Sequence, residues 1–299
     1  MWTASRWNSY EVLDASQGEK LERWGDYTLI RPDPQVIWNT QRKDSGWKHC
    51  NGHYHRSHSG GGEWEFFSLP KTWTISYDNP VFSQPLVFHL KPFSFKHTGL
   101  FPEQAVNWDW CAEKIAKRIA SGGTARILNL FAYTGGATIA CAAAGASVTH
   151  VDASKGMVSW AKENAASSGL SDAPVRWLVD DCRKFVEREI RRGHHYDGII
   201  MDPPSYGRGP KGEIWKMEDN IYDLVELTAQ LMSDTPLFFL LNAYTTGLQP
   251  GVLTYLLSTA LLPKYPGIKT ARVGASEIGL PVKSSGLILP CGAAGRFEV

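Results

Sequence analysis

The 299-residue sequence lacks several features that would assign it to a specialised class of protein. No stretch approaches the roughly 18 consecutive apolar residues of a membrane-spanning helix. The first six residues, Met1 to Arg6, are too polar for a secretory signal. No internal repeat or low-complexity segment stands out. Because hydrophobic residues make up 43% of the chain, enough for a core, we expect a soluble, cytoplasmic, globular protein.

Charge of one sign and paired cysteines are also missing. The net charge of +1 gives no global electrostatic argument for nucleic acid and none against a local basic patch. The five cysteines are an odd number, widely scattered and without a CxxC pair, which favours reduced thiols over a disulfide framework. They are Cys50, Cys111, Cys141, Cys182 and Cys291.

The chain has two halves of different texture. Seven of the twelve tryptophans precede residue 80, among short alternating segments such as 27–30 and 73–77. These segments predict a small, Trp-rich, β-rich N-terminal domain over residues 1–95. Residues 96–122 are expected to be a linker with a helix near 103–120.

From residue 123 to 299, strand-like runs alternate with helix-like runs. Strands are predicted at 125–130, 147–151, 175–178, 196–201 and 236–241. Helices are predicted at 137–144, 155–168, 183–191 and 219–232, and a closing hairpin at 267–274 and 286–290. Such alternation predicts a Rossmann-like α/β domain, a mostly parallel sheet with helices on both faces.

A glycine turn follows the first predicted strand. After the strand the chain reads Phe131-Ala132-Tyr133-Thr134-Gly135-Gly136. Glycines allow a ligand to approach the backbone, and the next helix presents free N–H groups at its start. No GxGxxG pattern is present, so a dinucleotide is not the first expectation. A tight turn needed only for packing is the alternative.

Carboxylates follow the next two predicted strands. Asp152 comes 16 residues after Gly136, where it can accept hydrogen bonds from ribose hydroxyls or cap the next helix. Asp181 follows the third strand, where it can reach an adenine amino group or cap a helix. Three successive strand ends that carry glycine, acid and acid predict an adenosine-shaped pocket.

The fourth predicted strand ends in Asp202-Pro203-Pro204-Ser205-Tyr206. Two prolines fix an extended path and remove two N–H donors. The Asp202 carboxylate and the Pro203 carbonyl are then acceptors, suited to a planar nitrogen substrate whose N–H bonds must be oriented. Tyr206 could stack on a base. The alternative is an ordinary turn after a buried strand.

These motifs resemble those of class I S-adenosylmethionine-dependent methyltransferases. Within that class, the sequence is most similar to bacterial large-subunit ribosomal RNA methyltransferases that make 5-methylcytosine or 7-methylguanine. The resemblance spans roughly residues 96–242. It rests on the segments 96–104, 129–136, 151–154, 160–164, 168–170 and 202–206.

The resemblance implies S-adenosylmethionine as cofactor, RNA as partner, and a role for each matching residue. The methionine side of the cofactor would be lined by Phe131, Tyr133, Thr134, Gly135 and Gly136. The ribose would bind at Asp152 and Ala153, and the adenine side would contain Asp181 and Cys182. Phe101 and Gln104 would close over the pocket. The catalytic residues facing the substrate would be Asp202, Pro203, Pro204 and Tyr206.

Two departures from the family pattern concern the substrate. Residues 1–95 do not match the RNA-binding module of one branch of the family. After the fifth strand, where the 5-methylcytosine branch carries a cysteine, this chain has Asn242 and Ala243. Carbon 5 of a pyrimidine becomes nucleophilic only after an enzyme thiolate adds to carbon 6.

We therefore expect a nitrogen acceptor, with Cys291 as the one cysteine that a C-terminal hairpin could bring back to the site. RNA is the favoured substrate. The alternatives are a protein or small-molecule methyltransferase, and a non-catalytic module that binds S-adenosylmethionine.

One cluster of metal-ligand residue types lies in the first half. Five such residues fall within ten positions: His49, Cys50, His53, His55 and His58. They could form a zinc site. Because glycines flank the run and its spacing matches no standard finger, we favour a solvated loop and predict no metal.

Overall fold

The computed structural model describes residues 1–57, 61–93, 96–208, 214–245 and 247–299. The strands are β1 (Trp2–Thr3), β2 (Tyr10–Ser16), β3 (Glu19–Trp24), β4 (Tyr27–Pro32), β5 (Gly52–Arg56), β6 (Gly62–Phe66), β7 (Trp73–Tyr77), β8 (Leu86–Leu90), β9 (Arg126–Leu130), β10 (Ser147–Asp152), β11 (Val175–Val179), β12 (Gly198–Met201), β13 (Tyr206–Arg208), β14 (Ile214–Lys216), β15 (Phe238–Ala243), β16 (Arg272–Pro281) and β17 (Ile288–Glu298). The α-helices are α1 (Ala105–Ala120), α2 (Gly136–Ala143), α3 (Lys155–Ser167), α4 (Cys182–Arg191), α5 (Met217–Ala229) and α6 (Pro250–Leu261). Short 3₁₀ turns cover Ser45–Trp47, Pro102–Gln104 and Leu262–Lys264.

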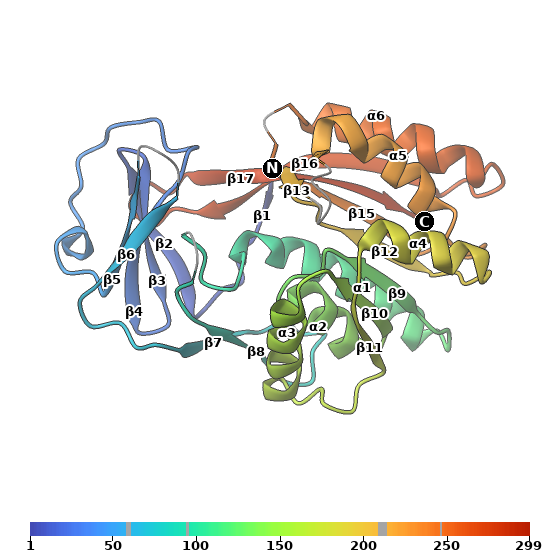
Figure 1. Ribbon diagram of the computed structural model, residues 1–299, viewed down its shortest axis with the longest axis horizontal. Helices are drawn as coiled ribbons and strands as arrows, with labels where there is room; N and C mark the ends of the chain where they lie inside the picture. The colour runs from blue at the N-terminus through green and yellow to red at the C-terminus, as the bar shows by residue number, and fades with distance from the viewer. Residues whose placement is uncertain (58–60, 94–95, 209–213, 246) are drawn as a thin grey trace.

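The larger sheet has eight strands in the order β1-β16-β17-β15-β12-β9-β10-β11. Its strands run parallel except β17, which is antiparallel to both β15 and β16. Helices α1, α2 and α3 cover one face, and α4, α5 and α6 cover the other (Figure 1). The predicted Rossmann-like α/β architecture, with a mostly parallel sheet between helices, is confirmed.

The central strands are buried on both faces. Along β9, Ile127 belongs to the apolar cluster that includes α1 and α2, whereas its neighbour Leu128 belongs to the cluster of α4, α5 and α6. Ile199 and Ile200 of β12 divide between the two clusters in the same way. Strands buried on both faces need continuous apolar runs rather than alternation, which is why these strands were recognisable from sequence.

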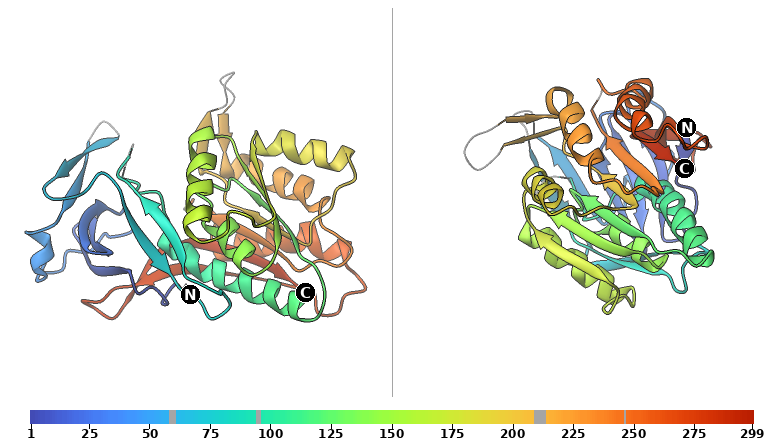
Figure 2. Two further views of the ribbon diagram at one scale, coloured as in Figure 1. Left: turned by 90° about the horizontal axis from the view of Figure 1, so that it is seen from below. Right: turned by 90° about the vertical axis from the view of Figure 1, so that its right-hand side faces the viewer.

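The first 95 residues form a five-stranded sheet, β2-β3-β4-β5-β6, and the hairpin β7–β8. This β-rich content confirms the prediction for the N-terminal part. The long strands β16 and β17 reach from the large sheet to the smaller one (Figures 1 and 2), where Lys283 N donates to Val12 O at 2.9 Å. The hairpin packs on α3, and Trp160 Nε1 donates to His89 O at 2.9 Å. The boundary at residue 95 stays a prediction.

Two expectations near the C-terminus were wrong. The closing hairpin exists, but its strands cover Arg272–Pro281 and Ile288–Glu298 rather than 267–274 and 286–290. Strand β17 continues through Gly295, where a Cβ would lie 2.7 Å from Leu257 of α6. Helix α6 itself was not predicted. It begins at Pro250 without a side-chain cap, so it lacks a start signal of that kind.

Candidate active site

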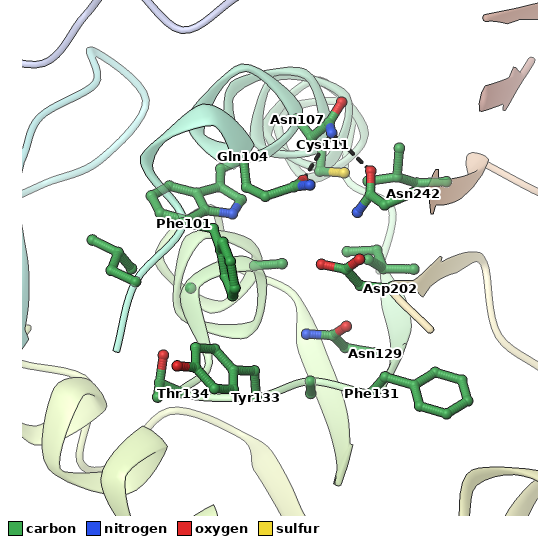
Figure 3. A pocket seen from close by; sticks show the side chains of 17 residues that line it. Phe101, Gln104, Asn107, Cys111, Asn129, Phe131, Tyr133, Thr134, Asp202 and Asn242 are labelled. Atoms are coloured by element: carbon green, nitrogen blue, oxygen red, sulfur yellow. Dashed lines mark hydrogen bonds between the residues drawn. The ribbon is translucent and has the colours of Figure 1, made fainter. Parts of the chain in front are cut away.

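A cavity opens at the carboxyl ends of β9, β12 and β15, beneath the start of α1 (Figure 3). It contains about 530 Å³ of empty space, including the part open to solvent. Ligand sites of open α/β sheets lie outside the carboxyl ends of the strands. The lining residues are Leu100, Phe101, Gln104, Asn107, Trp108, Cys111, Asn129, Phe131, Ala132, Tyr133, Thr134, Gly136, Ala137, Ile200, Asp202, Leu240 and Asn242.

The loop from β9 to α2 forms one wall of the cavity and has an unusual backbone. Phe131 and Tyr133 have φ angles of 57° and 49°, and Gly135 has 85°. Positive φ is rare for residues other than glycine, and among the described residues only Gln17 shares it. Two hydrogen bonds hold the loop: Ala132 N donates to Val151 O at 3.1 Å, and Tyr133 N to Asp152 Oδ2 at 2.8 Å. Such strain persists where the surrounding structure fixes it, typically at functional sites.

The same loop is tied to the segment that covers the cavity. Thr134 Oγ1 donates to Gly99 O at 2.6 Å, and Asn164 Nδ2 of α3 donates to Thr134 O at 2.9 Å. Phe101, from the covering segment, packs against Tyr133 with ring centroids 5.5 Å apart. Helix α2 then begins at Gly136 without a side-chain cap, which leaves its first N–H groups available to a ligand.

Seven of the predicted site residues line the cavity, namely Phe101, Gln104, Phe131, Tyr133, Thr134, Gly136 and Asp202. The predicted residues Gly135, Asp152, Ala153, Asp181 and Cys182 do not. The Asp152 carboxylate instead holds the loop, because it accepts hydrogen bonds from the backbone N–H groups of Tyr133 and, at 2.8 Å, of Ser154. Burial raises the pKa of this carboxyl.

The two residues assigned to the adenine side have structural contacts of their own. Asp181 is exposed and caps α4, with Oδ1 accepting from Lys184 N at 2.9 Å. The Cys182 thiol is buried and accepts from Phe131 N at 3.3 Å. Their predicted roles toward the cofactor therefore remain proposals.

Asp202 is the member of the Asp-Pro-Pro-Ser-Tyr motif that reaches the cavity. Its carboxylate points to the centre of the cavity (Figure 3), and no hydrogen-bond donor to it occurs among the described residues. Burial, reinforced by the charge of Glu103, raises the pKa of Asp202 to about 7. A carboxyl with such a pKa can exchange a proton near neutral pH.

The other three motif residues that were predicted to face the substrate lie outside the cavity wall. Pro203 is buried, and Pro204 is exposed with its carbonyl accepting from Trp215 Nε1 at 2.6 Å. Tyr206 lies on β13 and is 51% exposed. An exposed ring at this place is compatible with the predicted stacking on a substrate.

Sequence reasoning missed several residues of the cavity. Asn107, Asn129 and Asn242 line it with amide groups, and Trp108 and Cys111 come from α1. Cys111 had been set aside because it falls outside the sheet, yet α1 carries it to the cavity wall. Asn129 lies in the segment 129–136 of the family resemblance but had no predicted role, and Asn107 and Asn242 belong to no motif, so only the tertiary structure shows that all three line the cavity.

The histidine cluster of the first half is partly a strand, not a loop. His53 and His55 lie on β5, and their ligand atoms and that of Glu65 are within 4.8 Å of one another. Each Nε2 already meets a carboxylate, His53 with Glu19 at 2.6 Å and His55 with Glu65 at 2.8 Å. His58 lies outside the described residues. Both histidines thus already have carboxylate partners, and the absence of a metal stays a prediction.

Two polar side chains of the cavity are left for a ligand. The Tyr133 hydroxyl is buried without a partner among the described residues, which is rare in folded proteins. The Asp202 carboxylate is half-buried in the cavity wall and can accept a hydrogen bond from a ligand.

Comparison with known proteins identifies the family of this chain. A profile described as S-adenosylmethionine-dependent methyltransferase matches residues 20–245, most of the chain. The chain belongs to this family. S-adenosylmethionine is therefore its cofactor.

A curated relative is similar over about half of this methyltransferase. Ribosomal RNA large subunit methyltransferase K/L of Shewanella frigidimarina is 31% identical over 148 residues, which are 49% of this chain and 20% of that protein. The protein of the same name from Pseudoalteromonas atlantica is 34% identical over 132 residues, 44% and 17% of the two chains. The chain thus spans about a fifth of the length of these relatives.

Solved structures extend the similarity to nearly the whole chain. A SAM-dependent methyltransferase from Agrobacterium tumefaciens is 33% identical, with a TM-score of 0.86 over 98% of this chain and 91% of that one. A candidate SAM-dependent methyltransferase from Streptococcus mutans shares the fold at 16% identity, with a TM-score of 0.69 over 99% and 76%. Within the described residues of this methyltransferase, no helix is long and apolar enough to cross a membrane.

Proposed function

We propose that this methyltransferase transfers the methyl group to a nitrogen of an RNA base, with Asp202 as the residue that orients the nitrogen and takes its proton. The observation that carries this proposal is the Asp202 carboxylate, which is aimed into the cavity without a donor and has a pKa of about 7. A planar N–H group is the partner that such an acceptor lacks.

These positions suggest separate roles for the cofactor and for the protein in the reaction. When bound, S-adenosylmethionine supplies an electrophilic methyl group attached to a sulfonium sulfur. The leaving group is the neutral thioether. The base nitrogen forms the bond to the methyl carbon, and the Asp202 carboxylate accepts the proton that this nitrogen loses. We propose that Asp152 holds the ribose hydroxyls and that the Phe131–Gly136 loop and the start of α2 hold the amino-acid end.

The cysteines argue against methylation at carbon. Burial raises the pKa of the Cys182 and Cys291 thiols, so both are protonated at neutral pH and are poor nucleophiles. The Cys291 thiol also donates to Leu289 O at 3.4 Å. Cys111 lines the cavity but lies on α1, whereas Asp202 lies at the end of β12. A nitrogen nucleophile requires none of these thiols.

RNA as the substrate is supported by the names of the curated relatives, which act on the RNA of the large ribosomal subunit. The exposed Tyr206 beside the cavity gives an aromatic surface on which a base could stack. An enzyme with such a substrate would work in the cytoplasm, where ribosomes are assembled.

Transfer of a labelled methyl group tests the substrate class. The protein is incubated with deuterium-labelled S-adenosylmethionine and, separately, with deproteinised total RNA and with RNA-free protein extract. We expect the label in RNA and none in protein. Asp202→Asn serves as the matched control that keeps the fold of the site. Label in the protein extract alone would contradict an RNA substrate.

A further inference from the structure

A chain of buried hydrogen bonds runs from β17 to the edge of the cavity, and we call Arg296, Asn107, Gln104 and Tyr244 the Arg296 relay. Arg296 is 9% exposed, with its guanidinium 3.8 Å from the ring centre of Trp2. Its Nε and Nη2 donate to Asn107 Oδ1 at 3.1 and 2.6 Å. The Arg296 guanidinium is therefore held in place at one end of the relay by burial, by the Trp2 ring and by Asn107.

In each hydrogen bond of the relay, the donor and the acceptor are fixed by chemistry. Arginine has donors and no acceptor, so Asn107 must turn its oxygen toward Arg296. The Asn107 nitrogen then donates to Gln104 Oε1 at 2.9 Å and to Asn242 Oδ1 at 3.0 Å (Figure 3). With its oxygen used, Gln104 presents its nitrogen and donates to the Tyr244 hydroxyl at 2.7 Å.

This polarity leaves two donors, one on Asn242 in the cavity wall and one on Tyr244, which is bonded to the cavity residue Gln104. Tyr244 accepts from Gln104 and keeps its own hydrogen, for which the described residues provide no acceptor. Burial raises the pKa of Tyr244 far above its ordinary value, so the hydroxyl stays protonated. Asn242 has given its oxygen to Asn107, and its nitrogen faces the cavity above Asp202 (Figure 3).

Tyr244 is placed to contact the acceptor substrate. Its ring packs on Phe101 with centroids 6.0 Å apart, and the negative charge of Asp202 is one of the causes, after burial, that raise the pKa of Tyr244. It also lines a second, adjoining cavity with Gln35 of the N-terminal part and Pro290 of β17. Tyr244 thus lines the second cavity and contacts Gln104 and Phe101, two residues that line the first.

We propose that the Arg296 relay fixes Tyr244 as a hydrogen-bond donor that, opposite the Asp202 acceptor, selects a methyl acceptor whose N–H lies next to a lone-pair atom. This inference rests on the proposed function and narrows its substrate to planar amide-like or amidine-like edges, which nucleobases present. A saturated amine has no lone-pair atom beside its N–H and would leave Tyr244 unpaired. Tyr244 is a substrate-contacting residue, and Arg296, Asn107 and Gln104 are positioning residues.

Reversing the last bond of the relay is the sharpest test. Tyr244→Phe removes the hydroxyl and keeps the ring. Gln104→Glu still accepts from Asn107 but forces Tyr244 to donate to the new carboxylate, so the donor is withdrawn from the substrate. We expect kcat/KM for RNA methylation to fall roughly 10²-fold in each variant, the usual loss for one buried catalytic donor. The double variant should fall no further than about threefold below the weaker single variant, because both remove the same donor.

Controls separate this role from a structural one. Tyr222→Phe removes an exposed hydroxyl that bonds to Glu226 and should transfer at the wild-type rate. The affinity of Tyr244→Phe for S-adenosylmethionine, measured by calorimetry, should stay within about threefold of wild type. Asn107→Asp, which reverses the relay one step earlier, replaces Gln104→Glu if that variant does not fold.

The outcomes distinguish the relay from the proposed substrate. Two results would contradict the role of the relay but leave the RNA substrate intact. One is unchanged RNA labelling by Tyr244→Phe, and the other is a loss of kcat/KM in the double variant equal to the product of the two single losses. Label in protein alone, with the same loss in both single variants, would overturn the RNA substrate and support the relay.

Discussion

Asp202 is the residue whose ionisation should govern the rate of transfer. Burial and Glu103 raise its pKa to about 7, and only the ionised form can accept a proton. The rate of the chemical step should therefore increase as pH rises through about 7 and level off above it. Single-turnover measurements across pH 5 to 9 test this expectation.

Asp202→Asn removes the proton acceptor but keeps the shape of the side chain. We expect the single-turnover rate to fall roughly 10²-fold or more, since positioning and proton acceptance are both lost. The remaining rate should no longer depend on pH near 7. A variant that transfers at the normal rate would show that Asp202 serves only the turn after β12.

Asp152 is the residue that should separate cofactor binding from chemistry. Its carboxylate already holds the backbone of Tyr133 and Ser154, so Asp152→Ala loosens the loop as well as the ribose contact. We expect an affinity loss for S-adenosylmethionine of roughly 1.5–3 kcal/mol, the range for a hydrogen bond to a charged group. Calorimetric titration measures it, with the exposed Asp172→Ala as control. An unchanged affinity would remove Asp152 from the cofactor site.

At the scale of elements, the order of strands and helices was predictable because each has a local signal. Apolar runs marked β12 and β15, and the glycines and acids after the strands marked the loops. In the Arg296 relay, Gln104 was predicted through the family resemblance of segment 96–104. Arg296, Asn107 and Tyr244 had no such signal, because each is an ordinary polar residue until the fold brings them together. The same holds for Cys111, which only the packing of α1 places at the cavity.

The β9–α2 loop depends on glycine at position 135. Gly135 has a φ of 85°, and a Cβ there would lie 2.9 Å from the Cβ of Ala161 in α3. Gly122 has a similar φ of 81° but open space around it. Gly135→Ala should therefore lower the unfolding free energy by more than Gly122→Ala, which costs roughly 1 kcal/mol from backbone strain alone.

Gly135→Ala should also weaken cofactor binding, and Gly122→Ala should not, because only the first displaces the loop. Thermal unfolding and calorimetry on the two variants measure these effects. Equal destabilisation by both changes, with cofactor affinity intact, would contradict the role assigned to this loop.

At the scale of the whole molecule, the N-terminal sheet is joined to the methyltransferase core at several places. Strand β1 pairs with β16, and the β7–β8 hairpin packs on α3. Arg31 of β4 donates to Lys96 O at 3.0 Å, and Lys96 Nζ donates to Pro32 O at 2.9 Å, just before the segment that covers the cavity. Sequence texture suggested two halves, but it could not show these contacts because they join residues far apart in the chain.

These contacts predict that the chain unfolds as one cooperative unit. Tryptophan fluorescence reports mainly on the first half, where seven of the twelve tryptophans lie, and far-ultraviolet circular dichroism reports on the helices of the second half. The two signals should change with the same midpoint on heating. Two separate midpoints would show that residues 1–95 fold independently of the rest.

The identity of the methylated atom tests the central claim most directly. RNA that has been incubated with the protein and deuterium-labelled S-adenosylmethionine is digested to nucleosides, and the labelled product is identified by mass spectrometry. The account predicts a nucleoside labelled on a base nitrogen that has a lone-pair neighbour, formed at a similar rate by Cys111→Ala and Cys291→Ser and lost with Asp202→Asn. A 5-methylcytosine product that disappears when Cys111 or Cys291 is replaced would contradict it.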